Sequence, residues 1–399
     1  MAVPIQRDPA RTRAALAGWL ATRPAAAGGQ VVWEVGEPTV PGDRGFSTEI
    51  LLVDAYRTGD DGHRAHHPLV VRLAADRYRV YPWDRFEVEC RVMATLDRDP
   101  SVAVPVVYGY EPDPAVLGAP FVVLGRVDGA VPADLPSYHR AGWVTQLPAH
   151  RRAALWDAAL TAMAAVHRVE PGQAGLADVD QPEYGQVGAG QQLRSYEANL
   201  EHFGVDPAAD PGVLGAALTW LHEHPPAEPH PPRLLWGDAR LGNIIFTGDE
   251  VGAILDWEMV TLGQPEADLA WFLHLDRHLS EGIGAPRLAG LPDRAATLER
   301  YAGLLGRPLA DLDYHTVSAA LRFALIATRV TRLVGEHAVL PPGTDLPLAR
   351  NATRLLGRVL EEVPAAAGVH RQAAPAGQVD RSAGPALPGS AAPLAKGTR

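Results

Sequence analysis

The sequence has little of what a secreted, membrane-spanning or disulfide-stabilised protein needs. Its 399 residues include one cysteine, Cys90, which excludes an intrachain disulfide and a cysteine-rich zinc site and suits a reducing compartment. No stretch reaches the roughly 18 unbroken apolar residues that cross a bilayer, and residues 1–13 lack the apolar core of a secretory signal. We therefore expect a cytoplasmic protein with no membrane partner.

An excess of positive charge is also missing. The chain carries 36 basic and 47 acidic side chains, a formal net charge of −11, so we expect no nucleic-acid partner. Hydrophobic residues make up 47% and charged residues 21%, which is enough apolar material for a folded core. The length exceeds that of one minimal domain and predicts two lobes, while the oligomeric state stays unknown.

The first third of the chain is rich in β-prone segments. An opening helix is expected at 10–22, and a second helix at 84–96, where Phe86, Cys90 and Met93 share one face. The predicted strands are short apolar runs that form an antiparallel sheet, at 31–35, 49–53, 68–74, 102–108 and 121–124.

A polar segment at 57–67 contains His63, His66 and His67. We interpret it as a solvated loop at a hairpin tip. A metal site is the alternative, but no carboxylate or cysteine framework accompanies these histidines.

From residue 130 onward the pattern becomes helical. Apolar stripes predict helices at 151–169, 191–203, 212–222, 267–279, 295–305 and 311–334. Beyond Pro364 the composition changes to Ala, Gly, Pro, Gln and Ser, which cannot bury enough apolar surface to fold. The predicted organisation is an N-terminal lobe at 1–124, a hinge at 125–129, a helical lobe at 130–364 and a disordered tail at 365–399.

The most informative motif lies between residues 234 and 258. An apolar run ends in Gly237 and Asp238, a loop leads to Asn243, and a hairpin that turns at 248–249 returns the chain to Asp256. Three oxygen-bearing side chains therefore converge at one end of a hairpin. Phosphoryl transfer needs such a set, because a carboxylate orients the hydroxyl and two hard oxygen ligands hold magnesium. The alternative is a turn-rich hairpin whose side chains make only local hydrogen bonds.

Over about residues 30–340 this sequence resembles the aminoglycoside phosphotransferase family, relatives of the protein kinases. The resemblance implies an α+β, two-lobed protein-kinase-like fold, with an antiparallel sheet and one helix in the N-terminal lobe. It also implies that Asp238 is the catalytic base and that Asn243 and Asp256 hold Mg²⁺. Arg240, two residues after the base, is expected to stabilise charge on the transferring phosphoryl group. Asp-Trp-Glu at 256–258 resembles the branch that includes kinase domains linked to acyl-CoA dehydrogenases.

Two residues are expected to support the catalytic loop. Trp236 stands where the family usually has histidine, which puts the packing of the loop in question. Asp268 either braces the loop, as the family implies, or caps the helix that begins near it. His167 matches a family position, but we interpret it as a buried, satisfied histidine.

The N-terminal lobe supplies candidate ATP-binding residues. Arg72 on a strand and Glu89 on the following helix can form the cation–carboxylate pair that holds the α- and β-phosphates, with arginine in place of the commoner lysine. A surface ion pair is the alternative. The loop Gly45, Phe46 and Ser47 can cover the phosphates, or be an ordinary turn. By resemblance, backbone at Gly125 and Val127 in the hinge meets adenine.

These residues predict an ATP- and Mg²⁺-dependent O-phosphotransferase that acts on a hydroxyl of a small molecule. The alternative is a catalytically weak, kinase-like nucleotide-binding module that acts through partners. A protein kinase is not supported, because no Asp-Phe-Gly or Ala-Pro-Glu marker follows.

The acceptor is left open between an aminoglycoside and a hydroxyacyl-CoA. Arg322, Arg329 and Arg332 fall on one face of the helix predicted at 311–334. A cationic wall would attract an anionic acceptor and repel an aminoglycoside. The alternative is a solvated basic stripe paired with nearby acids.

Deleting residues 365–399 should leave ATP-dependent phosphoryl transfer intact, because this segment has no apolar stripe with which to dock. The check compares specific activity and melting temperature of the truncated and full-length chains. A large fall in melting temperature would show that the segment is structural.

Overall fold

The computed structural model describes residues 8–23, 32–41, 49–59, 61–74, 79–206, 212–336 and 346–364. The predicted tail at 365–399 and the candidate phosphate loop of Gly45, Phe46 and Ser47 lie outside these ranges.

The N-terminal lobe is built on a five-stranded antiparallel sheet with the order β1-β2-β3-β5-β4. Its strands are β1 (Val32–Val35), β2 (Glu49–Thr58), β3 (Arg64–Leu73), β4 (Val107–Glu111) and β5 (Phe121–Gly125). Side chains alternate across β5: Phe121 and Val123 pack into one core, whereas Val122 and Leu124 pack into another. This period of two is what a strand buried on both faces requires.

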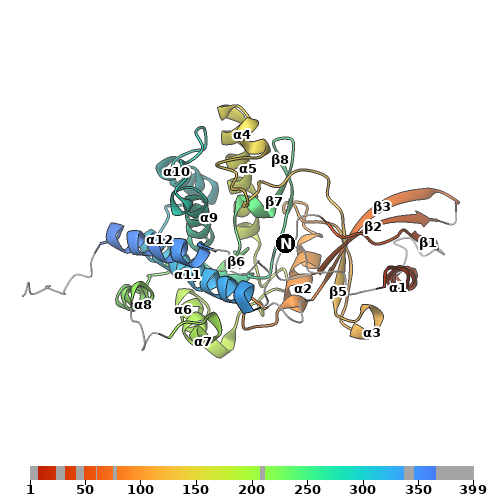
Figure 1. Cartoon of the computed structure of the whole chain (residues 1–399), viewed down its shortest axis with the longest axis horizontal. Helices are drawn as coiled ribbons and strands as arrows, with labels where there is room; N and C mark the ends of the chain where they lie inside the picture. Colours follow the sequence, from red (N-terminus) through yellow and green to blue (C-terminus); the bar gives the residue numbers. More distant parts are fainter. Residues whose placement is uncertain are drawn as a thin grey trace, which may run out of the picture. The chain divides into compact units, whose positions relative to one another are not determined.

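Helices cover both faces of the sheet. On one face, α1 (Pro9–Ala21) buries Leu16, Trp19 and Leu20 in a core shared with β2, β3 and β5, and α3 (Pro114–Leu117) joins the same core. On the other face, α2 (Phe86–Leu96) buries Cys90 and Met93 in the larger core that continues into the helical lobe. Figure 1 shows α1 and α3 near β1, β2 and β5, with α2 on the side of the later helices.

The second lobe is mainly helical. Its helices are α4 (Trp143–Gln146), α5 (Ala149–Arg168), α6 (Ala189–Glu197), α7 (Leu200–Phe203), α8 (Val213–Glu223), α9 (Glu266–Leu279), α10 (Arg294–Leu305), α11 (Leu312–Glu336) and α12 (Leu348–Glu362). Single 3₁₀ turns lie at Pro182–Tyr184, Leu241–Asn243 and Glu281–Ile283. Two short antiparallel pairs join β6 (Arg233–Leu235) to β9 (Thr261–Gly263) and β7 (Ile244–Thr247) to β8 (Glu250–Ile254).

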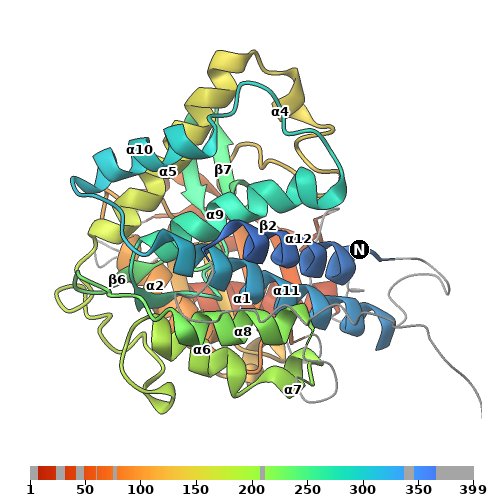
Figure 2. The same cartoon turned by 90° about the vertical axis from the view of Figure 1, so that its left-hand side faces the viewer.

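Buried stripes hold the helices together. The predicted stripe on α5 is buried, including Leu155, Ala159, Met163 and Val166. Helices α11, α12 and α8 contact one another, as Figure 2 shows. None of the helices in the described ranges is long and apolar enough to cross a membrane.

Three sequence predictions were wrong in detail, and one helix was missed. The loop predicted at 57–67 is too long, because β2 and β3 continue to Thr58 and from Arg64, and the Tyr56 and His66 rings stack across the strands with centroids 4.9 Å apart. His66 and His67 therefore lie on a strand rather than in a loop. The strand predicted at 102–108 begins only at Val107, because Pro105 has no N–H for a ladder.

The other two differences concern helices. The helix predicted at 191–203 is broken at Asn199, whose side-chain Nδ2 donates to the Ser195 carbonyl over 2.7 Å and competes with the backbone. Helix α12 was not predicted, although Ala352, Leu355 and Val359 form its buried stripe.

Candidate active site

The β7–β8 hairpin brings the motif residues together. β6 leads into the loop that carries Asp238, a 3₁₀ turn ends at Asn243, and the hairpin register pairs Ile244 with Ile254. The Leu255 N–H donates to the Asn243 carbonyl over 2.8 Å, which places the residue before Asp256 beside Asn243. As predicted from the spacing, the loop and the hairpin bring Asp238, Asn243 and Asp256 near one another.

Two backbone positions in this site have positive φ. Gly237 has φ +89°, and a Cβ there would clash with the Met259 carbonyl, so only glycine fits before Asp238. Asp256 has φ +61°, a conformation that is uncommon for a residue with a side chain. Strain of this kind persists where the surrounding structure holds it in place.

Asp268 holds the backbone of the catalytic loop. Its carboxylate accepts from the N–H of Trp236 over 2.7 Å and of Gly237 over 3.0 Å, and it does not cap α9. The His167 ring lies 2.9 Å from the same carboxylate, and its other nitrogen contacts the Tyr301 hydroxyl. His167 is thus buried and hydrogen-bonded.

Trp236 and Arg322 add two further contacts to this loop. The Trp236 indole N–H donates to the Leu255 carbonyl over 2.8 Å, and the ring is fully buried, so tryptophan packs in place of the family's histidine. Arg322 donates to the Gly237 carbonyl over 2.8 Å and lies over the Trp271 ring at 3.8 Å. The arginine expected in an acceptor wall therefore supports the loop.

The Asp238 carboxylate is fixed by three donors. Oδ1 accepts from the Trp271 indole over 2.8 Å, and Oδ2 accepts from Arg240 over 3.0 Å and from Asn243 over 2.6 Å. Burial by itself would raise the pKa of Asp238, but the Arg240 guanidinium and these hydrogen bonds outweigh it and hold the pKa below its usual value. Arg240 is held from its other side by Asp134.

Asp256 is the least satisfied carboxylate in the site. Its Oδ1 is buried with no hydrogen-bond partner among the described residues. Burial and the nearby Asp238 raise the pKa of Asp256 to about 6. A carboxylate oxygen without a partner, close to the Asp238 carboxylate, fits a divalent cation that prefers oxygen ligands.

The described residues contain no cluster of three or more His, Cys, Asp or Glu side chains for a metal. Two protein ligands suffice for Mg²⁺, which commonly keeps waters and phosphate oxygens as its remaining ligands.

Arg72 and Glu89 form the predicted ion pair. The pair is buried, with side chains 12% and 2% exposed, so it is not a surface contact. Burial by itself would lower the pKa of Arg72, but Glu89, Asp256 and Glu258 together outweigh it and hold the pKa above its usual value. The sequence has a single lysine, Lys396, so within the described ranges arginine has to supply this cation.

Comparison with known proteins decides the family. A model of the phosphotransferase enzyme family matches residues 52–304, more than half of the chain. The chain belongs to the phosphotransferase enzyme family.

Curated relatives of this chain carry acyl-CoA dehydrogenase names. Acyl-CoA dehydrogenase family member 11 of Mus musculus is 24% identical over 356 residues, which cover 84% of this chain and 44% of the relative. A probable acyl-CoA dehydrogenase of Arabidopsis thaliana is 27% identical over 269 residues, 61% of this chain and 30% of the relative. The chain thus spans less than half of these relatives.

Solved structures share the fold. A putative aminoglycoside phosphotransferase from Ralstonia eutropha matches with a TM-score of 0.62 at 22% identity, over 87% of this chain and 95% of that one. A thermostable mutant of aminoglycoside phosphotransferase APH(4)-Ia, in complex with ADP and hygromycin B, matches with a TM-score of 0.51 at 14% identity, over 82% and 94%. The predicted two-lobed, kinase-like α+β fold is confirmed.

Backbone hydrogen bonds within the protein already engage part of the predicted hinge. The Gly125 N–H already donates to the Val106 carbonyl, and the Arg126 N–H to the Pro68 carbonyl, each over 2.8 Å. These amides are engaged within the protein, so the predicted adenine contact would involve other backbone groups near Val127.

The three arginines of α11 have different surroundings. Arg322 is buried, whereas the Arg332 side chain is 53% exposed and pairs with Glu336 over 2.6 Å. Arg329 lies 3.3 Å from the Arg79 carbonyl and 3.9 Å from Glu336. They do not form one open cationic wall.

Sequence reasoning missed Trp271 and Asp134. Trp271 follows Asp268 by three residues on α9, a spacing that places both on the face toward the catalytic loop. That spacing was a usable signal. Asp134 lies 106 residues from Arg240 in an irregular segment, and no local pattern indicates the pairing.

Asp256→Asn should stabilise the protein without Mg²⁺ and nucleotide, and raise the Mg²⁺ concentration needed for activity. The folded-state pKa of about 6 lies above the ordinary 3.8, so this group costs stability as pH rises from about 4 to about 6, and the cost stays above that. We expect melting temperature to rise by about 2 °C or more at pH 7.5 and by less at pH 5. Asp249→Asn, at the exposed hairpin turn, is the control. If the melting temperature of Asp256→Asn rose equally at pH 7.5 and pH 5, that result would contradict the argument.

Proposed function

We propose that this phosphotransferase transfers the γ-phosphate of ATP to a hydroxyl of a small molecule, with Mg²⁺ as cofactor. The observation that carries the proposal is the Asp238 carboxylate, fixed by Trp271, Arg240 and Asn243 beside the unsatisfied Asp256. Phosphoryl transfer depends mainly on the positioning of its reacting groups, so it requires a fixed carboxylate next to oxygen ligands.

Asp238 would act mainly by orienting the acceptor hydroxyl. Its lowered pKa makes it a weak base, and a loose transition state demands little proton abstraction before the new bond forms. Asp238 accepts the hydroxyl proton as the acceptor oxygen bonds to phosphorus and the bond to the leaving ADP oxygen breaks. Arg240, next to Asp238, stabilises negative charge on the transferring group.

Asn243 and Asp256 would hold Mg²⁺, and Arg72 would contact the phosphates. Bound Mg²⁺ would neutralise charge on the phosphate oxygens. Glu89 fixes the Arg72 guanidinium, which leaves its remaining N–H groups for the α- and β-phosphates. A structural neighbour with ADP bound supports nucleotide as the donor.

Asp238→Ala should abolish phosphoryl transfer and leave ATP affinity within a few-fold, because Asp238 acts on the acceptor. Product formation is measured by mass after a screen of hydroxylated metabolites, and ATP affinity by titration with Mg²⁺. The Asp249→Ala variant at the exposed turn controls for removal of a carboxylate. Turnover above about a hundredth of wild type would refute the role of Asp238. ATP binding by the wild type without turnover on any acceptor would instead favour a module that acts through partners.

For the acceptor, we propose an anionic or neutral alcohol with an apolar part, such as a hydroxyacyl-CoA. Tyr196 interacts with Arg322 and lies near Asp238, and Trp83 contacts Tyr196 with ring centroids 6.1 Å apart. Tyr81 stacks on Trp83 at 5.4 Å. These rings give the base an aromatic neighbour on the side of α6, which suits an apolar chain better than a polycation. The acyl-CoA dehydrogenase names of the relatives point to the same class of acceptor.

A hydroxyacyl-CoA should be phosphorylated with at least tenfold higher kcat/KM than kanamycin. Tyr196→Ala should raise KM for the hydroxyacyl-CoA, because an aromatic contact is lost, while kcat changes less. Steady-state kinetics with both acceptors measure this. Efficient kanamycin phosphorylation that is unaffected by Arg329→Glu would refute the proposed acceptor class.

A further inference from the structure

Arg322 is a buried cation that makes no ion pair with a carboxylate in the described ranges. The residue is 8% exposed, its guanidinium donates to the Gly237 carbonyl over 2.8 Å, and it lies 3.8 Å from the centroid of the Trp271 ring. A carbonyl oxygen and an aromatic face carry only partial negative charge, so neither neutralises the arginine. A buried cation without a counter-charge is costly, and its place beside the candidate active site points to a function there.

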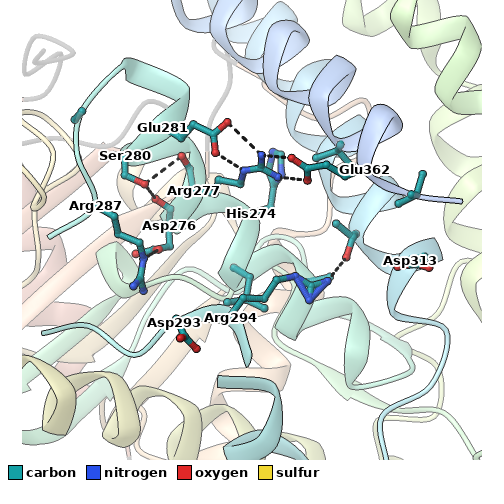
Figure 3. A pocket seen from close by; sticks show the side chains of 16 residues that line it. His274, Asp276, Arg277, Ser280, Glu281, Arg287, Asp293, Arg294, Asp313 and Glu362 are labelled. Carbon is teal, nitrogen blue, oxygen red and sulfur yellow. Dashed lines mark hydrogen bonds and ion pairs between the residues drawn. The ribbon is translucent and has the colours of Figure 1, made fainter. Parts of the chain in front are cut away.

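An arginine elsewhere in the helical lobe does have such partners. Figure 3 shows a pocket of about 620 Å³ whose walls include parts of α9, α11 and α12. Arg277 in this pocket binds both Glu281 and Glu362, over 2.7 Å and 2.6 Å. Its charge is balanced within the protein, whereas the charge of Arg322 is not.

Arg322 also hydrogen-bonds the side chain of Tyr196, a half-buried residue of α6. An arginine side chain has donors and no acceptor, so the phenol oxygen accepts and its own proton stays available. No hydrogen bond within the described ranges uses that proton. The adjoining cation polarises the O–H group and makes it a stronger donor. Tyr196 therefore offers an unused donor on a partly open side chain.

This donor lies beside the carboxylate that would orient the acceptor. Arg322 contacts the carbonyl directly before Asp238 and the ring of Trp271, which donates to Asp238 Oδ1 over 2.8 Å. Burial raises the pKa of the Tyr196 hydroxyl, Arg322 opposes the rise, and the Asp238 charge adds to it. Because the Asp238 charge acts on this hydroxyl, the two groups can contact one molecule.

The other phenol of the same aromatic wall is already used. Tyr81 stacks on Trp83, which in turn contacts Tyr196, with centroid distances of 5.4 Å and 6.1 Å respectively. The Tyr81 hydroxyl donates to Met259 Sδ over 2.8 Å. Of these two phenols, that of Tyr196 is the one left to donate to an acceptor molecule.

Resting on the hydroxyacyl-CoA class proposed above, we propose that the Tyr196 hydroxyl donates a hydrogen bond to the carbonyl oxygen of the acceptor. The acceptor hydroxyl then lies at Asp238 and the thioester carbonyl at Tyr196. A carbonyl oxygen accepts hydrogen bonds and carries partial negative charge, so it suits both the phenol O–H and the cation behind it. Arg322 is a positioning residue, because it acts through the phenol. The contact selects a hydroxyl that has a carbonyl nearby over a plain alcohol.

Isothermal titration of the full-length protein without ATP tests the contact apart from phosphoryl transfer. The probes are 3-hydroxybutanoyl-CoA and its thioether analogue S-(3-hydroxybutyl)-CoA, in which a methylene replaces the carbonyl. We expect the wild type to bind the thioester at least about tenfold more tightly, since the analogue leaves the phenol donor without a partner. Tyr196→Phe keeps the ring and should bind both probes about equally, with the affinity of the wild type for the thioether.

Tyr184→Phe is the matched control. Tyr184 is also half-buried, and its phenol oxygen accepts a hydrogen bond from Asn199 Nδ2 over 3.0 Å rather than from an arginine. This variant should keep the full preference for the thioester. A loss of preference in Tyr184→Phe as large as that in Tyr196→Phe would overturn the proposal.

Arg322→Lys tests the positioning role. In the wild-type background it should lower the ratio of thioester to thioether affinity, whereas in the Tyr196→Phe background it should leave the ratio near one. A purely structural role would weaken both probes alike in either background, and that result would overturn the role of Arg322. Melting temperatures of all variants check the fold, and Tyr196→Phe decides the contact by itself if the arginine variant does not fold.

The contact and the proposed activity can fail separately. Equal affinity of the wild type for both probes, no binding of either, or full preference retained in Tyr196→Phe would each overturn the contact. A preference for the thioester without phosphorylated product would support the contact and refute the activity. Product from both probes with equal kcat/KM would leave the activity standing and overturn the contact.

Discussion

The candidate active site depends on one buried carboxylate. Asp268, 1% exposed, accepts two backbone N–H groups of the loop and so fixes the peptide planes on either side of Trp236. If it were removed, two buried donors would be left unsatisfied, and the left-handed conformation of Gly237 would lose its restraint. His167 and Tyr301 hold Asp268 from behind, so α5, α9 and α10 all bear on the orientation of Asp238. Trp271, also on α9, donates directly to the Asp238 carboxylate.

The two central carboxylates differ because their neighbours differ. Asp238 has three donors and a lowered pKa, whereas Asp256 has an oxygen without a partner and a raised pKa. Environments that push the pKa values of paired acids apart assign them different roles. A stabilised carboxylate suits orientation of a hydroxyl, and a destabilised one gains most from a cation. The buried Asp256 carboxylate therefore has an unfavourable electrostatic energy, which binding of a metal ion would relieve.

The proximity of the motif residues could be predicted from the sequence because they lie close together along the chain. Asp238, Asn243 and Asp256 are connected by one loop and one hairpin, so their spacing fixes their proximity. The Arg72 and Glu89 pair was predictable because the helix directly follows the strand in a small sheet. Asp134 and Tyr301 join the site from 106 and 134 residues away from their partners, and such tertiary contacts leave no local periodicity to recognise, whereas the three-residue spacing from Asp268 to Trp271 was a usable signal. Helix α12 had a readable stripe that was overlooked, so its absence from the prediction was not a physical limit.

Arg322 shows why a helical face read from sequence does not define a binding surface. Spacing placed it with Arg329 and Arg332, but a 25-residue helix turns each side chain toward a different neighbour along its length. Near the Gly237–Asp238 loop, Arg322 is buried against Trp271 and donates to the Gly237 carbonyl, so its role there is structural. Near the end of the helix, the same residue type pairs with Glu336 in solvent, where an ion pair contributes little. Acceptor preference should therefore depend more on the aromatic side chains beside Asp238 than on the number of arginines on α11, since Arg322 is held by the Gly237 carbonyl and Arg332 pairs with Glu336.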